Sequence, residues 1–152
     1  MSKFESFRLF EMKKRQLLSQ AHKKRRLRIN EVSLQYDGAY LEDGIINIAF
    51  KTTTSKKGTT YNQLIQILDV NNKIDKNNLL KSLKGNLKVD CSCPDYLYKG
   101  FKYIGTVKDY AIEDEDIKPI ETNPELKGSV CKHLLAILIN IEKYVPQILE
   151  DL

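Results

Sequence analysis

The feature that most constrains this chain is the grouping of its sulfur and imidazole side chains into two short clusters. All three cysteines and one of the two histidines occur as a Cys-x-Cys pair and a Cys-x-His pair, at Cys91, Cys93, Cys131 and His133. Three cysteines cannot all pair within one chain, and two cysteines separated by one residue do not easily form a mutual disulfide. Clusters of this form favour a bound metal ion over a disulfide framework.

The expected local geometry of each pair lets it share one ion. In a strand, side chains two residues apart point to the same side, so Cys91 and Cys93 present two thiolates about 6–7 Å apart along the backbone. In a regular helix, residues two apart lie on nearly opposite faces. The second pair therefore requires Cys131 at the edge of a helix and His133 in its first turn. Ser129 is a candidate cap for that helix, whose dipole favours an ionised Cys131 thiolate.

Three sulfur ligands and one imidazole form a closed tetrahedral set, for which zinc is the usual occupant. Because protein side chains fill all four positions, none remains for an activated water, and the ion is expected to stabilise the fold. The alternative is that the cysteines are small buried hydrophobic residues and His133 is an ordinary helix residue. The clustering favours the metal, so we predict one structural zinc ion per chain.

The sequence does not indicate an enzyme. It contains no G-x-S-x-G motif, no phosphate-binding glycine loop and no spare Cys–His pair. His22 lies among lysines and arginines, whose positive field disfavours its protonation. We therefore expect no catalytic residues and no small-molecule substrate.

The residues around the two clusters resemble the SWIM zinc finger. Its pattern of C-x-C, a spacer and C-x-H leading into an apolar helix reads here as VDCSCPD at 89–95 and GSVCKHLL at 128–135. The resemblance implies a ββα zinc unit with these four residues as ligands, in a family that binds nucleic acid or protein. The spacer of 37 residues is longer than is usual for that family.

A narrower resemblance covers the C-terminal third of the chain. The strings CSCPDYLYKGFKYIGT and TNPELKGSVCKHLLAIL are similar to short SWIM-like proteins encoded by tailed bacteriophages, several of them beside virion structural genes. This resemblance implies a virion component, for example a portal or neck ring or a head–tail adaptor, with other virion proteins as partners. The alternative is a soluble SWIM-type accessory protein that binds nucleic acid. The expected location is the virion or the host cytoplasm.

The positive charge of the chain is concentrated in one segment. Between Met12 and Asn30 there are eight basic and no acidic residues, whereas the rest of the chain carries 17 basic and 20 acidic ones. The eight are Lys13, Lys14, Arg15, Lys23, Lys24, Arg25, Arg26 and Arg28. Such a segment is compatible with phosphate contacts, with an acidic partner surface, or with the solvated face of a surface helix.

The apolar pattern predicts one α+β domain preceded by a helical arm. Residues 1–26 are expected to form a basic amphipathic helix, and 27–152 a single domain with the SWIM-like zinc unit at 87–145. The longest apolar run, Leu134 to Ile139, has six residues and is too short for a membrane span. The N-terminus lacks the features of a secretory signal. We therefore expect a protein of a reducing compartment, without a membrane partner.

Period-two alternation indicates an antiparallel sheet formed by residues 27–54 and 61–70, with turn signals at Asp37-Gly38 and Asp43-Gly44. A helix is expected to begin after Asp75, its N-cap, and to end before Gly85. A final helix over 130–143 should end before Pro146 and close the zinc unit.

Residues 95–127 show the least regular pattern. Their aromatic residues could form a small core around the zinc loop or stacking platforms for unpaired bases, and we favour the core. These residues are Tyr96, Tyr98, Phe101, Tyr103 and Tyr110. The acidic run Glu113–Asp116 lacks the glycine and spaced oxygen ligands of a calcium loop, so we expect a solvated loop there.

Overall fold

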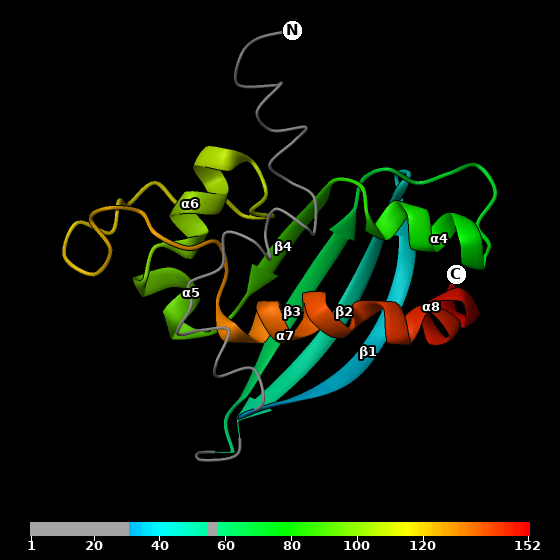
Figure 1. The fold of residues 1–152 in the computed structure, drawn as a ribbon, viewed down its shortest axis with the longest axis horizontal. Helices are drawn as coiled ribbons and strands as arrows, with labels where there is room; N and C mark the ends of the chain where they lie inside the picture. Colours follow the sequence, from blue (N-terminus) through cyan, green and yellow to red (C-terminus); the bar gives the residue numbers. More distant parts are fainter. Residues whose placement is uncertain (1–30, 55–57) are drawn as a thin grey trace, which may run out of the picture.

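The computed structural model describes residues 31–54 and 58–152, and the predicted helical arm at 1–26 lies outside these residues. In chain order the elements are β1 (Val32–Glu42), β2 (Ile45–Thr54), β3 (Thr60–Ile67), α4 (Lys76–Leu83), β4 (Leu87–Cys91), α5 (Pro94–Tyr98), α6 (Phe101–Lys108), α7 (Lys132–Asn140), the 3-10 helix η2 (Ile141–Tyr144) and α8 (Val145–Asp151). The strands of the described part pair antiparallel in the order β1-β2-β3-β4 (Figure 1). The fold is therefore α+β, as the sequence predicts.

The two Asp-Gly pairs have different roles in the first hairpin. Glu42 pairs with Ile45, which leaves Asp43 and Gly44 as a two-residue turn with φ angles of 51° and 77°. Positive φ at both positions is what a type I′ hairpin turn requires. The predicted turn at Asp37-Gly38 is wrong. The register shifts between Tyr36 and Gly38, so Asp37 is the extra residue of a β-bulge and β1 continues through it.

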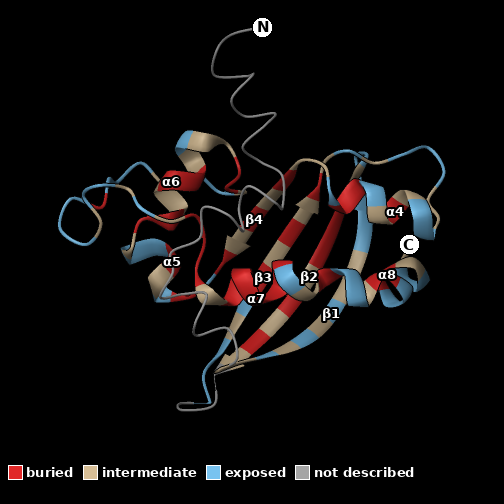
Figure 2. Cartoon of the chain, in the orientation of Figure 1, coloured by how far each residue is buried: buried red, intermediate tan, exposed pale blue. Residues whose placement is uncertain are grey.

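One face of the sheet carries the hydrophobic core. Alternate residues of β2, β3 and β4 are at most 1% exposed: Ile46, Ile48, Phe50, Ile65, Ile67, Leu87 and Val89. Helix α7 crosses this face and contacts both β1 and β4 (Figure 1). Its residues from His133 to Leu138 are all buried (Figure 2). A stretch of helix that is buried on every side lies within the core, so the first part of α7 is held in a dry environment.

Helix α4 begins as the sequence predicts. The Asp75 carboxylate accepts a hydrogen bond from the backbone N–H of Asn78 at 2.8 Å, which makes Asp75 the N-cap. Gly85 follows the C-cap Lys84, also as predicted. An added Cβ at Gly85 would lie 2.5 Å from a carboxylate oxygen of Asp69. The glycine therefore permits a close approach between the residues that follow α4 and those that follow β3.

The C-terminal helices differ from the prediction. Helix α7 ends at Asn140, and the chain continues through η2 into α8. Pro146 does not end a helix but lies in the first turn of α8, where its missing N–H has no intrahelical role. The segment 95–127, predicted to be irregular, contains α5 and α6. Within the described residues, every helix is too short or too polar to cross a membrane.

Gly100 joins α5 to α6 in the left-handed backbone conformation and packs against Pro119. Its φ is 79°, and an added Cβ would clash with the ring of Pro119. We expect Gly100→Ala to lower the free energy of unfolding by about 1–3 kcal/mol in urea titrations, because it adds left-handed strain and displaces Pro119. Gly58→Ala is the matched control, since Gly58 has φ of 62° with nothing within 4 Å of the added Cβ. Equal losses in the two variants would contradict the role of Pro119.

Candidate metal centre

Each predicted ligand lies at the end of an element. Cys91 is the last residue of β4, and Cys93 is the N-cap of α5. Cys131 is the N-cap of α7, with extended backbone, and His133 is the second residue of that helix. The helix-edge geometry that the Cys-x-His spacing requires is thus confirmed. The prediction that Ser129 caps the helix is wrong, because the helix begins two residues later and Cys131 takes the capping position.

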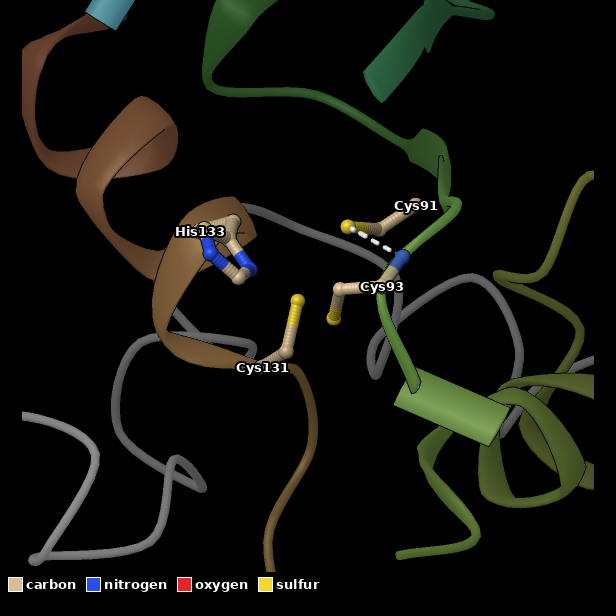
Figure 3. Close-up of side chains that lie close together, drawn as sticks. All are labelled: Cys91, Cys93, Cys131 and His133. Carbon is tan, nitrogen blue, oxygen red and sulfur yellow. Dashed lines mark hydrogen bonds between the residues drawn. The ribbon is translucent and has the colours of Figure 1, made fainter. Parts of the chain in front are cut away.

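The four side chains converge from two sides on one point (Figure 3). Cys91 and Cys93 approach from the end of the sheet, and Cys131 and His133 approach from the start of α7. Their ligand atoms all lie within 4.8 Å of one another, and all four residues are buried. Residues separated by a 37-residue spacer are therefore brought to one site by the packing of α7 across the sheet.

Backbone and tyrosine hydrogen bonds hold the two halves of the site together. The N–H of Val89 donates to the carbonyl of Tyr110 at 2.7 Å, and the N–H of Ile112 donates to the carbonyl of Val89 at 3.0 Å. The buried hydroxyl of Tyr110 then donates to the carbonyl of Ser129 at 2.6 Å. The strand that ends at Cys91 and the segment that leads to Cys131 are thus both fixed to Tyr110.

Gln63 is a supporting residue that the sequence reasoning missed. It faces Cys91 across the β3–β4 ladder, and its side-chain amide donates to the Cys91 sulfur at 3.4 Å and to the Thr52 hydroxyl at 2.7 Å. The backbone N–H of Cys93 also donates to the Cys91 sulfur, at 3.5 Å (Figure 3). The available signal was a glutamine in the same alternating series as the core residues Ile65 and Ile67.

The electrostatics of the site favour a cation. Hydrogen bonds from the thiols of Cys131 and Cys93 lower the pKa of Cys91 to about 4. Burial raises the pKa of the Cys131 thiol, and so do the hydrogen bonds that it gives to the other two sulfurs. The buried space therefore accepts one negative charge readily, whereas further thiolates there need a positive ion to neutralise them. A divalent metal supplies that charge.

His133 supports the same assignment. Its side chain is 3% exposed, and neither ring nitrogen has a hydrogen-bond partner among the described residues. The ring of Tyr61 lies against it, with centroids 5.1 Å apart. A buried polar group without a partner costs about 1–3 kcal/mol, and coordination of a metal would satisfy one of these nitrogens. Three sulfurs and one imidazole nitrogen, enclosed and unshared with solvent, are compatible with one zinc ion.

The structure tests some of the remaining predictions about individual residues. Tyr96, Phe101 and Tyr110 are buried in the core, as favoured, and Tyr103 is half-buried. Tyr98 is 66% exposed, so the core prediction is wrong for that residue. Glu113–Asp116 lies in a loop between elements, as expected. The eight basic residues Lys13, Lys14, Arg15, Lys23, Lys24, Arg25, Arg26 and Arg28 lie outside the described residues.

Comparison with known families agrees with the site. The family model of the SWIM zinc finger matches residues 70–102 and 125–142, which include all four ligands and make up about a third of the chain. The unmatched residues 103–124 fall within the long spacer. No curated protein and no solved structure matches the chain.

The contact between Gln63 and Cys91 predicts an effect on metal affinity. We expect Gln63→Leu to weaken zinc binding by about 10–100-fold in a chelator competition, because groups that hydrogen-bond to ligands tune the ligands. Gln66→Leu is the matched control, since Gln66 lies on the same strand but donates to Asn47. If the two variants lost zinc affinity equally, the Gln63 contact would have no specific effect on the site.

Proposed function

We propose that this chain is a non-enzymatic adaptor or structural protein in which a zinc ion fixes the fold. The observation that supports this is the closed donor set: four buried protein ligands leave no position for a reacting water or substrate. A zinc ion there would neutralise the thiolates and cross-link the end of β4 to the start of α7. Hydrogen bonds from Tyr110 and Gln63 would hold the two pairs of ligands in place.

The test is whether the folded state of the chain depends on bound zinc. We expect the purified chain to contain one zinc ion and to lose its cooperative unfolding transition when a strong chelator removes the metal at neutral pH. Returning zinc should restore the transition, whereas magnesium, which prefers oxygen ligands, should not. An unfolding transition that is unchanged by the chelator would contradict the proposal.

For the setting of this adaptor we propose the virion of a tailed bacteriophage, in a portal or neck ring or at a head–tail junction. The support is the resemblance of residues 91–106 and 122–138 to short phage-encoded SWIM-like proteins. Quantitative mass spectrometry of purified particles should then find the chain at a fixed copy number relative to the portal protein. Its absence from particles that assemble normally would contradict this setting.

A second candidate function is nucleic-acid binding through the basic segment, and the distribution of charge favours it. The described residues carry 13 lysines and no arginine against 18 acidic residues, whereas residues 1–30 carry ten basic and two acidic ones. The test is binding of a fluorescent DNA duplex across a salt series. Phosphate contacts predict an affinity that falls steeply with salt and is lost when Arg25, Arg26 and Arg28 are neutralised. A flat signal at low salt would leave protein docking as the role of this segment.

A further inference from the structure

A surface pocket of about 340 Å³ lies between α5 and the loop that follows α6, and none of its lining residues is one of the four predicted metal ligands. Its apolar lining comes from Leu97 and Tyr98 of α5 and from Ile117, Pro119 and Ile120 of the loop. Four of these side chains are strongly exposed: Ile117 by 78%, Ile120 by 71%, Tyr98 by 66% and Leu97 by 42%. Large apolar side chains grouped in a hollow of this kind mark an interaction site.

The pocket is a fixed feature of the fold. The Thr122 hydroxyl donates to the carbonyl of Tyr98, and the Asn123 side chain donates to the carbonyl of Lys99 at 2.9 Å. At the other end of the loop, the N–H of Glu115 donates to the Thr106 hydroxyl at 2.8 Å. These bonds tie the loop to α5 and α6, so its isoleucines are held outward although the loop has no regular secondary structure.

The loop 113–121, which forms the rim on one side of the pocket, is acidic, and its Glu115 and Glu121 line the pocket itself. Residues 113–121 contain five carboxylates, Glu113, Asp114, Glu115, Asp116 and Glu121, and a single lysine, Lys118. Glu113 has an ion-pair partner in Lys102 at 3.3 Å. An occupant that suits this surface presents apolar side chains to the hollow and positive charge to the rim.

We propose that the occupant is residues 4–28 of the same chain. This segment contains the apolar residues Phe4, Phe7, Leu18 and Ala21 and the eight clustered basic residues. Over helical spacing these four apolar residues fall near one face, Phe10 and Leu17 widen the apolar stripe, and basic residues lie on much of the other side. The segment therefore offers the two chemistries that the pocket and its rim require.

The point where this segment joins the described fold favours docking within one chain. Glu31 forms an ion pair with Lys132 at 3.7 Å, which places residue 31 next to the ligand Cys131. The Cys131 sulfur is within 4.8 Å of the sulfur of Cys93, and Cys93 caps α5, the helix that forms one wall of the pocket. A segment tethered this close has a high effective concentration at the pocket, so an intramolecular contact outcompetes one between copies.

The loop side of the pocket lies in residues 103–124, between the two segments that match the zinc-finger family. The long spacer between the two ligand pairs thus supplies one side of the proposed docking site. The inference does not depend on the proposed function, because it concerns where the basic segment lies and not what the protein binds.

Carbodiimide coupling of the zinc-loaded, full-length chain tests the inference, because this reagent joins only a carboxylate and an amine that are already in contact. An equimolar mixture of isotopically light and heavy chains distinguishes links within a chain from links between copies. We expect mass spectrometry to find amide links from Lys13, Lys14, Lys23 or Lys24 to the carboxylates of residues 113–121, in pairs of one isotope. The double variant Ile117→Ser, Ile120→Ser should reduce their yield about tenfold by removing the apolar contacts.

Val107→Ser is the control, since Val107 is also an exposed apolar side chain, at 46%, but does not line the pocket. It should leave the yield unchanged, and zinc content should be the same in all variants. Three results would overturn the inference: an undiminished yield in the double variant, links in mixed-isotope pairs, or links to distant carboxylates such as Glu42 and Asp43.

Discussion

Replacing His133 by alanine is expected to release zinc and to give the largest loss of stability of any single substitution proposed for this chain. The imidazole is the only nitrogen donor among the four ligands, and its removal leaves three thiols in a buried space. Structural zinc contributes roughly 10–16 kcal/mol in small zinc-finger peptides. Because this fold also has a hydrophobic core, we expect His133→Ala to lose a part of that, on the order of 5 kcal/mol. Urea unfolding at fixed free zinc, with metal analysis of each sample, measures both effects.

The other histidine provides the control for this experiment. His22→Ala removes an identical side chain outside the two clusters and should leave zinc content and unfolding unchanged. Cys131→Ser should reproduce the effect of His133→Ala, since both remove one ligand from the start of α7. If His133→Ala kept its zinc and its stability, His133 would be an ordinary buried helix residue.

Ile65→Ala is expected to give the second largest effect, a loss of about 2–5 kcal/mol in the free energy of unfolding. Ile65 is fully buried at the centre of the sheet, where it pairs with Ile48 on one side and Val89 on the other. Truncation removes buried methyl groups and leaves a cavity that neighbouring strands cannot close. Zinc must be buffered during the measurement, because ligand binding to the folded state shifts the apparent stability.

Two further variants calibrate this result. Ile65→Val, which removes one methylene group, should lose only about 0.5–1.5 kcal/mol. Ile139→Ala changes an isoleucine of α7 that is 44% exposed, and it should change stability by less than the central substitution. Equal losses at positions 65 and 139 would contradict the assignment of Ile65 to the hydrophobic core.

The features that sequence predicts correctly are those with a short-range physical cause. Cys91 and Cys93 present their sulfurs to one buried site, as predicted, although Cys93 lies beyond the end of β4 as the N-cap of α5. The turn at Asp43-Gly44 and the cap at Asp75 follow from the backbone preferences of these residues. The convergence of the four metal-binding side chains is predicted by their grouping into a Cys-x-Cys and a Cys-x-His pair, a donor set that suits one metal ion.

The features that sequence misses depend on tertiary contacts. Helices α5 and α6 are short, and what fixes them is the burial of Tyr96, Phe101 and Ile104 against the core. The dipeptide Asp37-Gly38 is typical of a turn, but β1 continues to pair with β2 beyond it, so the site is a β-bulge. Pro146 fits either the end of one helix or the start of another, and only the path of η2 decides between them.

The most direct test of the zinc assignment is the X-ray absorption spectrum of the purified chain at the zinc edge. We expect a first shell of three sulfur atoms and one imidazole nitrogen, with no water oxygen, from one zinc ion per chain. A first shell that contains a water oxygen or fewer than three sulfurs would contradict the closed, structural site formed by Cys91, Cys93, Cys131 and His133.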